Sequence, residues 1–188
     1  PISSLLKITR NEKYSFLLES VEGGDQRGRF SLLGCDPDLI WEVKKNKVNI
    51  KSLDKNLDLS FISNNPIQSL KELVVFSRIK RDIDMPPFPV LVGYLGYPMI
   101  SLMEQIKLKN LDTINIPDAV MIRPKLVAVF DNIKDTINIM TSIYPNKKIK
   151  ADTAIDLGYD YIDKAIEKLK KEIPINPVIK NREYEVIN

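Results

Sequence analysis

Histidine is absent from the 188 residues, and cysteine occurs once, at position 35. Because histidine is the usual general acid and base at neutral pH, its absence excludes a Ser-His-Asp triad. Structural zinc sites need four nitrogen or sulfur ligands and catalytic ones about three protein ligands, so a chain with no histidine and one cysteine makes zinc improbable. A single cysteine excludes an internal disulfide and fits a reducing compartment. We therefore expect a cytoplasmic protein with no cofactor of its own, in which Cys35 packs in the core.

Long apolar runs and basic stripes are also missing. No apolar run approaches the roughly 20 residues that a membrane-spanning helix needs. The formal net charge of +3 comes from lysines and arginines scattered among acids. Neither a membrane nor nucleic acid is therefore expected as a partner. The chain begins without Met or a signal-peptide core, which indicates a piece whose true start is missing.

Strands are predicted in consecutive antiparallel pairs. Alternating or continuous apolar segments separated by turn residues carry this prediction. Trp41 is the expected core anchor. The three predicted pairs are Tyr14–Val21 with Gly28–Leu33, Leu39–Val43 with Lys47–Leu53, and Pro124–Asp131 with Thr136–Tyr144. A further strand in "VLVGYLGY" has glycines at 93 and 96, which indicate close approach by another strand.

Two longer helices are predicted from caps and helical spacing. Asn65 and Pro66 begin the first, whose apolar face holds Ile67, Leu70, Leu73 and Val74. Asp152 is expected to cap the second, and a short helix is expected after the "VLVGYLGY" strand. The apolar face of the second helix is predicted to hold Ile155, Tyr159, Ile162, Ala165, Ile166, Leu169 and Ile173. The predicted class is α+β, with one domain over 1–174 and a linker over 175–188.

The stretch from Leu17 to Gly34, "LLESVEGGDQRGRFSLLG", is the one candidate site that the residues themselves offer. A pocket for a zwitterionic amino acid needs an acid, hydroxyl or guanidinium donors, and an apolar wall. These groups are supplied by Glu19, Ser20, Arg27, Arg29 and Phe30. Neighbouring strand residues point to opposite faces, so Glu19 and Ser20 share a pocket only if one acts through its backbone or the strand ends there. The alternative interpretation is a hairpin with a solvated loop and two surface arginines.

Three longer segments resemble a known family. The first is "SFLLESVEGGDQRGRFSLLGCDP", the second "PPFPVLVGYLGYPMISLMEQI", and the third "IPDAVMIRPKLVAVFDNIKDTINIMT". In this order they resemble the N-terminal domain of anthranilate synthase component I, the large subunit of an enzyme of tryptophan biosynthesis. The resemblance covers nearly the whole chain.

The resemblance implies a regulatory piece without the chemistry. In the family, the motif matched by Leu17, Leu18, Glu19 and Ser20 lines the site of the feedback inhibitor L-tryptophan. The return strand, Arg27, Gly28, Arg29 and Phe30, is expected to complete that wall. Chorismate and Mg²⁺ bind in a C-terminal domain of the family, which also contributes to the inhibitor pocket. The implied partners are L-tryptophan, that missing domain and a glutamine amidotransferase subunit.

Two other functions remain open at this point. The homologous large subunit of aminodeoxychorismate synthase, in folate synthesis, shares this architecture. A purely structural interaction domain, whose apolar face packs on a partner, is the alternative from a different class.

Overall fold

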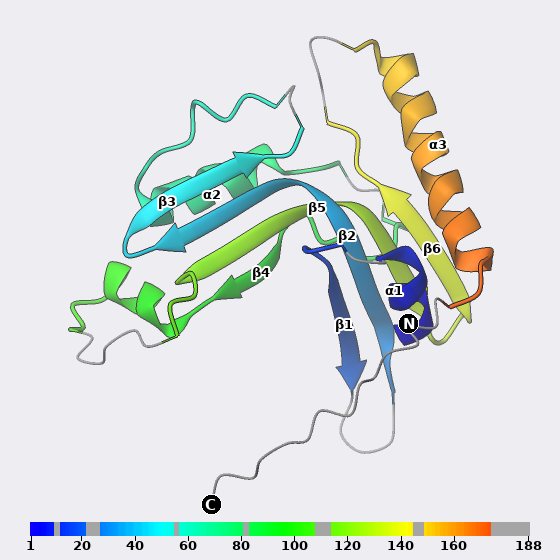
Figure 1. The fold of residues 1–188 in the computed structure, drawn as a ribbon, viewed down its shortest axis with the longest axis horizontal. Coiled ribbons are helices and arrows are strands. Elements are labelled where there is room, and N and C mark those ends of the chain that lie inside the picture. Colours follow the sequence, from blue (N-terminus) through cyan, green and yellow to red (C-terminus); the bar gives the residue numbers. More distant parts are fainter. Residues whose placement is uncertain are drawn as a thin grey trace, which may run out of the picture.

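The computed structural model describes residues 1–9, 12–21, 27–54, 57–80, 83–107, 114–144 and 149–173. Helices pack on a single antiparallel sheet of six strands, which confirms the predicted α+β class (Figure 1). The elements are α1 (Ile2–Ile8), β1 (Phe16–Val21), β2 (Arg27–Lys44), β3 (Lys47–Ser52), α2 (Pro66–Phe76), β4 (Val92–Leu95), the 3₁₀ helix η1 (Tyr97–Leu102), β5 (Ala119–Asp131), β6 (Thr136–Thr141) and α3 (Ala151–Lys170).

Two long strands, β2 and β5, form the frame of the sheet. They pair with each other along most of their length, from Phe30 opposite Asp131 to Val43 opposite Ala119. The first part of β2 also pairs with β1, and its last part pairs with β3. The first part of β5 pairs with β4, and its last part pairs with β6. Figure 1 shows both long strands bending in the middle of the sheet.

The prediction of two separate strands over residues 28–33 and 39–43 was wrong, because β2 runs through both. Pro37 lies opposite Pro124, and neither proline can donate a ladder hydrogen bond. A register shift follows between Pro37 and Leu39, with Asp36 at φ 48° just before it. A bulge of this kind bends a strand and re-aims its side chains. Leu33 and Cys35, before the shift, therefore pack near α1 and α3, whereas Leu39 and Trp41, after it, pack near α2.

Trp41 anchors the core under α2, as predicted. Its side chain is fully buried, and its indole N–H donates to the Ser69 hydroxyl at 2.9 Å. Asn65 caps α2 as expected, because its side chain accepts from the Gln68 backbone N–H at 3.0 Å. Val74, predicted to be on the apolar face, is exposed instead. The inward side of α2 is centred on Ser69 and Leu73, so Val74 points away from the sheet.

Helix α3 follows β6 and begins after Lys150, so the predicted cap at Asp152 was wrong by two residues. Of its twenty residues only Gly158 and Ala165 are buried, whereas Ile155 and Tyr159 are exposed. A Cβ at Gly158 would lie 3.0 Å from Ile143 Cδ1, so small residues mark the line of close contact with the sheet. The apolar spacing correctly predicted a helix but gave too wide a buried face.

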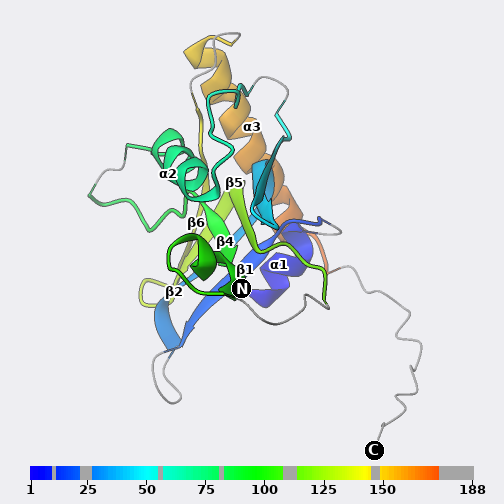
Figure 2. The ribbon, with the colours of Figure 1, turned by 90° about the vertical axis from the view of Figure 1, so that its left-hand side faces the viewer.

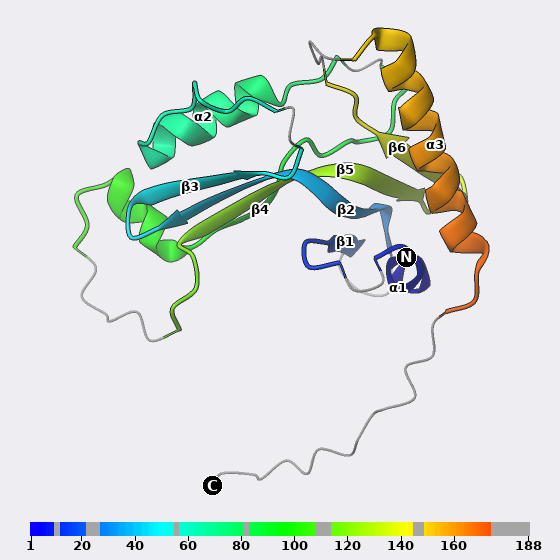
Figure 3. The same ribbon diagram turned by 45° about the horizontal axis from the view of Figure 1, so that its top comes forward.

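Helix α1 was not predicted from the sequence. It is only seven residues long, too short for helical periodicity to stand out, and it buries Ser4 and Ile8 against the sheet. Helices α1 and α2 lie on opposite sides of the sheet (Figure 2 and Figure 3). The loop over 22–26 and the linker predicted over 175–188 fall outside the described residues, so the proposed domain boundary stays a prediction.

Gly93 is closely approached by a neighbouring strand, as predicted from the sequence. A Cβ there would lie 1.8 Å from the Val120 carbonyl oxygen of the neighbouring strand β5. The short helix expected next is the 3₁₀ helix η1. Within the described part of the chain, none of the helices has the length and apolar character that crossing a membrane requires.

Candidate functional site

A cavity of about 390 Å³ lies at the end of β1, beside the start of α1. Its volume falls in the range of roughly 300–1,000 Å³ that is usual for small-molecule sites. The lining residues are Pro1, Ile2, Ser3, Glu19, Ser20, Ser31 and Asn132. Glu19 and Ser20, the two residues on which the sequence hypothesis depends, therefore share one cavity.

An irregularity in the β1–β2 pairing explains how neighbouring residues line one cavity. Glu19 pairs with Ser31, and Val21 pairs with Arg27. Over this stretch β2 advances by four residues while β1 advances by two. Strict alternation of side chains is lost at such a shift. Strand β1 does not end at Glu19 and Ser20, as one sequence alternative required, but continues irregularly to Val21.

Gly28 supports the position of Ser20 from the facing strand. A Cβ at Gly28 would lie 2.1 Å from Ser20 Oγ and 2.9 Å from the Ser20 carbonyl carbon. Asn132, in the turn after β5, donates from its side-chain amide to the Gly28 carbonyl at 2.8 Å. The Asn132 backbone N–H donates to the Arg29 carbonyl, also at 2.8 Å. This turn therefore fixes the irregular part of β2 against the end of β1.

Arg29 is engaged in an ion pair beside the cavity. Its Nη2 lies 3.0 Å from Asp131 Oδ2, and its Nε lies 3.4 Å from both carboxylate oxygens. The guanidinium also lies 4.6 Å from the Phe30 ring centroid. Hydrogen bonding from Arg29 holds the pKa of Asp131 below its ordinary value, although burial acts in the opposite direction. Arg29 is not among the residues that line the cavity.

Leu18 and Phe30 lie on the other face of the sheet from Glu19. Leu18 pairs with Leu32, and both Leu32 and Phe30 pack near Val127 and Val129. Leu17, one residue along, packs instead against the cluster under α1 and α3. The structure thus brings together Glu19, Ser20 and Gly28, but not the predicted apolar wall. Arg27 begins β2, and its side chain lies outside the described part of the structure.

Sequence reasoning missed the remaining lining residues. Ser31 stands in the predicted return strand, directly opposite Glu19, and strand register alone could have indicated it. The fold brings Asn132 and the start of α1 to the cavity. No local sequence pattern marks these residues as part of a site. Neither lysine nor arginine is among the described residues that line the cavity.

Cys35 is a core residue, as expected. Its side chain is 1% exposed, and burial raises the pKa of the thiol to about 12. The nearby carboxylates of Glu12 and Asp36 act in the same direction. The thiol therefore stays protonated at neutral pH and is a poor nucleophile. Among the described residues, no group of three or more histidine, cysteine or acidic side chains could hold a metal ion.

Comparison with known proteins identifies the relatives of this chain. No family model matches it. It is 33% identical over 177 residues to anthranilate synthase component 1 of Cereibacter sphaeroides, covering 93% of this chain and 35% of that protein. It is 30% identical over 141 residues to anthranilate synthase component 1 of Thermus thermophilus, covering 74% of this chain and 29% of that protein.

A solved structure shares the fold. The crystal structure of anthranilate synthase component I from Streptococcus pneumoniae matches with a TM-score of 0.59 and 21% identity, over 82% of this chain and 32% of that one. The chain is therefore an antiparallel α+β domain of the type found in that enzyme. In sequence it is a homologue of the N-terminal part of anthranilate synthase component 1, and it spans about a third of the length of these relatives.

Proposed function

We propose that the chain is the regulatory N-terminal domain of an anthranilate synthase component I and that it binds the feedback inhibitor L-tryptophan. The observation that carries the proposal is the shared cavity of Glu19 and Ser20. A carboxylate there suits the ammonium group of an amino acid. The hydroxyls of Ser20 and Ser31 suit its carboxylate. Homology to component I supplies the reason to place tryptophan there.

The cavity is an incomplete site for a zwitterion. Arg29 already pairs with Asp131, and the described lining contains no lysine or arginine. A ligand carboxylate buried without a cation is poorly stabilised. We therefore infer that the rest of a component I polypeptide completes the pocket.

An exposed apolar surface supports contact with the rest of such a polypeptide. Tyr94 and Leu95 on β4, Tyr97 on η1 and Met103 just after η1 are all exposed. Four large apolar side chains exposed within this short segment favour a partner at this end of the sheet. Inhibition then requires only that tryptophan binds more tightly to one arrangement of this domain and the rest of the polypeptide than to another. Allosteric coupling free energies of this kind are about 1–3 kcal/mol. Chorismate, ammonia from a glutamine amidotransferase subunit, and Mg²⁺ belong to the part outside this chain.

The proposal is tested by an assay with chorismate, ammonia and Mg²⁺. The complete component I that contains this chain should form anthranilate, and L-tryptophan should inhibit it. The 188-residue chain alone should form no product, in keeping with its lack of histidine. Formation of 4-amino-4-deoxychorismate would instead identify the folate enzyme, and tryptophan-insensitive anthranilate formation would contradict the regulatory role.

Replacing Gly28 by alanine should weaken tryptophan binding at least about fivefold. The added Cβ would overlap Ser20 Oγ and crowd the Ser20 backbone, so the end of β1 must move. Calorimetric titration of complete component I measures the dissociation constant. The matched control is Gly158→Ala on α3, where the nearest atom is the flexible end of Ile143 at 3.0 Å. Equal affinity in both variants would contradict this role of Gly28.

A further inference from the structure

Helix α3 carries an apolar stripe that is not buried against the sheet. Four large apolar residues follow one another at spacings of four, three and four residues, which places them on one side of a helix. They are Ile155, Tyr159, Ile162 and Ile166, and we call them the outer stripe. Ile155 is 46% exposed and Tyr159 is 66% exposed, whereas the other two are half-buried.

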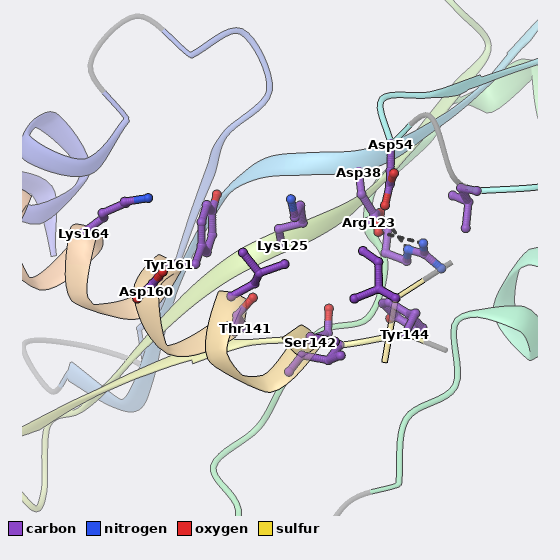
Figure 4. A pocket seen from close by; sticks show the side chains of 16 residues that line it. Asp38, Asp54, Arg123, Lys125, Thr141, Ser142, Tyr144, Asp160, Tyr161 and Lys164 are labelled. Atoms are coloured by element: carbon purple, nitrogen blue, oxygen red, sulfur yellow. Dashed lines mark hydrogen bonds and ion pairs between the residues drawn. The ribbon is translucent and has the colours of Figure 1, made fainter. Parts of the chain in front are cut away.

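The packed side of α3 lies elsewhere on the helix. Gly158 and Ala165 are its buried residues, and Tyr161 packs against the cluster under α1 and α3. Figure 4 shows Tyr161 and Lys164 on the side of α3 that lines a cavity against β5 and β6, and no residue of the outer stripe lines this cavity. At 3.6 residues per turn, the outer stripe is centred roughly 80° round the helix from Gly158 and Ala165. The stripe therefore lies beside the line of contact with the sheet, on a helix at the outer edge of the molecule (Figure 1 and Figure 3).

Charge is divided along α3. Residues 151–163 contain four aspartates and no lysine or arginine, whereas residues 164–170 contain three lysines and one glutamate. Asp152 and Lys170 are 18 residues apart, which is about five helical turns, so both lie on the same side of α3 and next to the outer stripe. Both are exposed, and neither forms an ion pair with another residue that the structure describes.

These charges favour a second copy of α3, running antiparallel, as the partner of the outer stripe. The midpoint of the stripe lies between residues 160 and 161, and the midpoint between Asp152 and Lys170 is residue 161. A two-fold axis at this point places Lys170 of one copy opposite Asp152 of the other, and the same pair forms again at the other end. A parallel arrangement would place like charges opposite each other, which is unfavourable.

We propose that two copies of this chain associate through the outer stripes of their α3 helices, packed antiparallel about a two-fold axis. Tyr159 lies near the centre of the stripe, where tyrosines often contribute most of the binding energy of an interface. One helix from each copy offers less area than the roughly 1,200–2,000 Å² of a stable complex, so the dimer is reversible, with a micromolar dissociation constant. No residue of the stripe lines the proposed tryptophan cavity, so the two proposals can fail separately.

Sedimentation equilibrium measures the association of the 188-residue chain and of the complete component I that contains it. Both are expected to form reversible dimers. Tyr159→Lys should raise the dissociation constant at least tenfold, because it places a charge in the apolar stripe. The matched control is Thr153→Lys, which adds the same charge at an exposed position of α3 outside the stripe and should change the dissociation constant less than twofold.

Disulfide cross-linking of the 188-residue chain tests the orientation of the helices without the lysine variants. Cys35 is 1% exposed, so the unmodified chain should not cross-link. Asp152→Cys and Lys170→Cys are prepared separately. The two positions are about 27 Å apart along the helix, and a disulfide joins Cα atoms about 4–7 Å apart. In an antiparallel pair neither variant should therefore link to itself, whereas a mixture of the two should form a linked dimer.

A chain that stays monomeric, or equal dissociation constants in the two lysine variants, would overturn the proposal. Absence of a link in the mixture, or a link within either cysteine variant alone, would contradict the antiparallel arrangement and overturn it as well. If the 188-residue chain is dimeric but complete component I is monomeric, the rest of that polypeptide covers the stripe, and the proposal is again overturned.

Discussion

Replacing Ser20 by leucine is expected to raise the tryptophan concentration needed for half inhibition of complete component I at least tenfold. Ser20 lines the cavity, and the β1–β2 irregularity holds it beside Glu19. A leucine side chain fills space that the ligand needs and removes a donor for its carboxylate. A tenfold change corresponds to about 1.4 kcal/mol, which lies within the usual range of allosteric couplings.

The measurement is an inhibition curve normalised to each variant's own uninhibited rate. Ser15→Leu is the matched control, because Ser15 is exposed, stands just before β1 and does not line the cavity. It should keep the inhibition curve of the unmodified enzyme. Equal inhibition of the Ser20 and Ser15 variants would remove Ser20 from the inhibitor site.

Replacing Arg123 by methionine should lower the free energy of unfolding by roughly 3–5 kcal/mol, because Asp38 is left buried without its partner. The pair joins β5 to the bulge of β2 through two hydrogen bonds of 2.7 Å. The change also removes the stacking contact with Tyr144. For a chain of this size, the melting temperature should fall on the order of 10 °C.

A double variant separates the contribution of the ion pair to stability from the contribution of side-chain packing. Arg123→Met with Asp38→Leu removes both charges, and buried pairs replaced by apolar residues are often neutral or stabilising. Urea unfolding should therefore show that the double variant regains most of the lost stability. If Arg123→Met alone unfolds with unchanged free energy, the pair is not the structural link described here.

Local sequence patterns predicted most of the elements of this fold. Alternation in "TINIMT", the cap at Asn65 and the apolar run around Trp41 each correspond to an observed strand or helix. The errors arise where tertiary pairing overrides local signals. Pro37 looks like a break between strands, yet β2 continues because Pro124 lies opposite it and a bulge absorbs the irregularity.

The candidate site was predicted only in part. Glu19 and Ser20 were identified from chemistry and resemblance, but their shared cavity depends on a register shift that no local pattern shows. Arg29 was counted as a free donor, whereas a residue 102 positions away, Asp131, engages it. A contact between residues so far apart in the sequence depends on the pairing of β2 with β5. Local sequence patterns do not show which strands pair.

Calorimetric titration of L-tryptophan into the complete component I that contains this chain tests the central claim most directly. The account predicts saturable binding of L-tryptophan, no binding of L-phenylalanine at the same concentrations, and at least tenfold weaker tryptophan binding in Glu19→Gln. The amide of that variant keeps the shape of Glu19 but loses the charge that pairs with the ligand ammonium, an interaction worth about 1.5–3 kcal/mol. No tryptophan binding to the unmodified protein, or equal affinity in the Glu19 variant, would contradict the account.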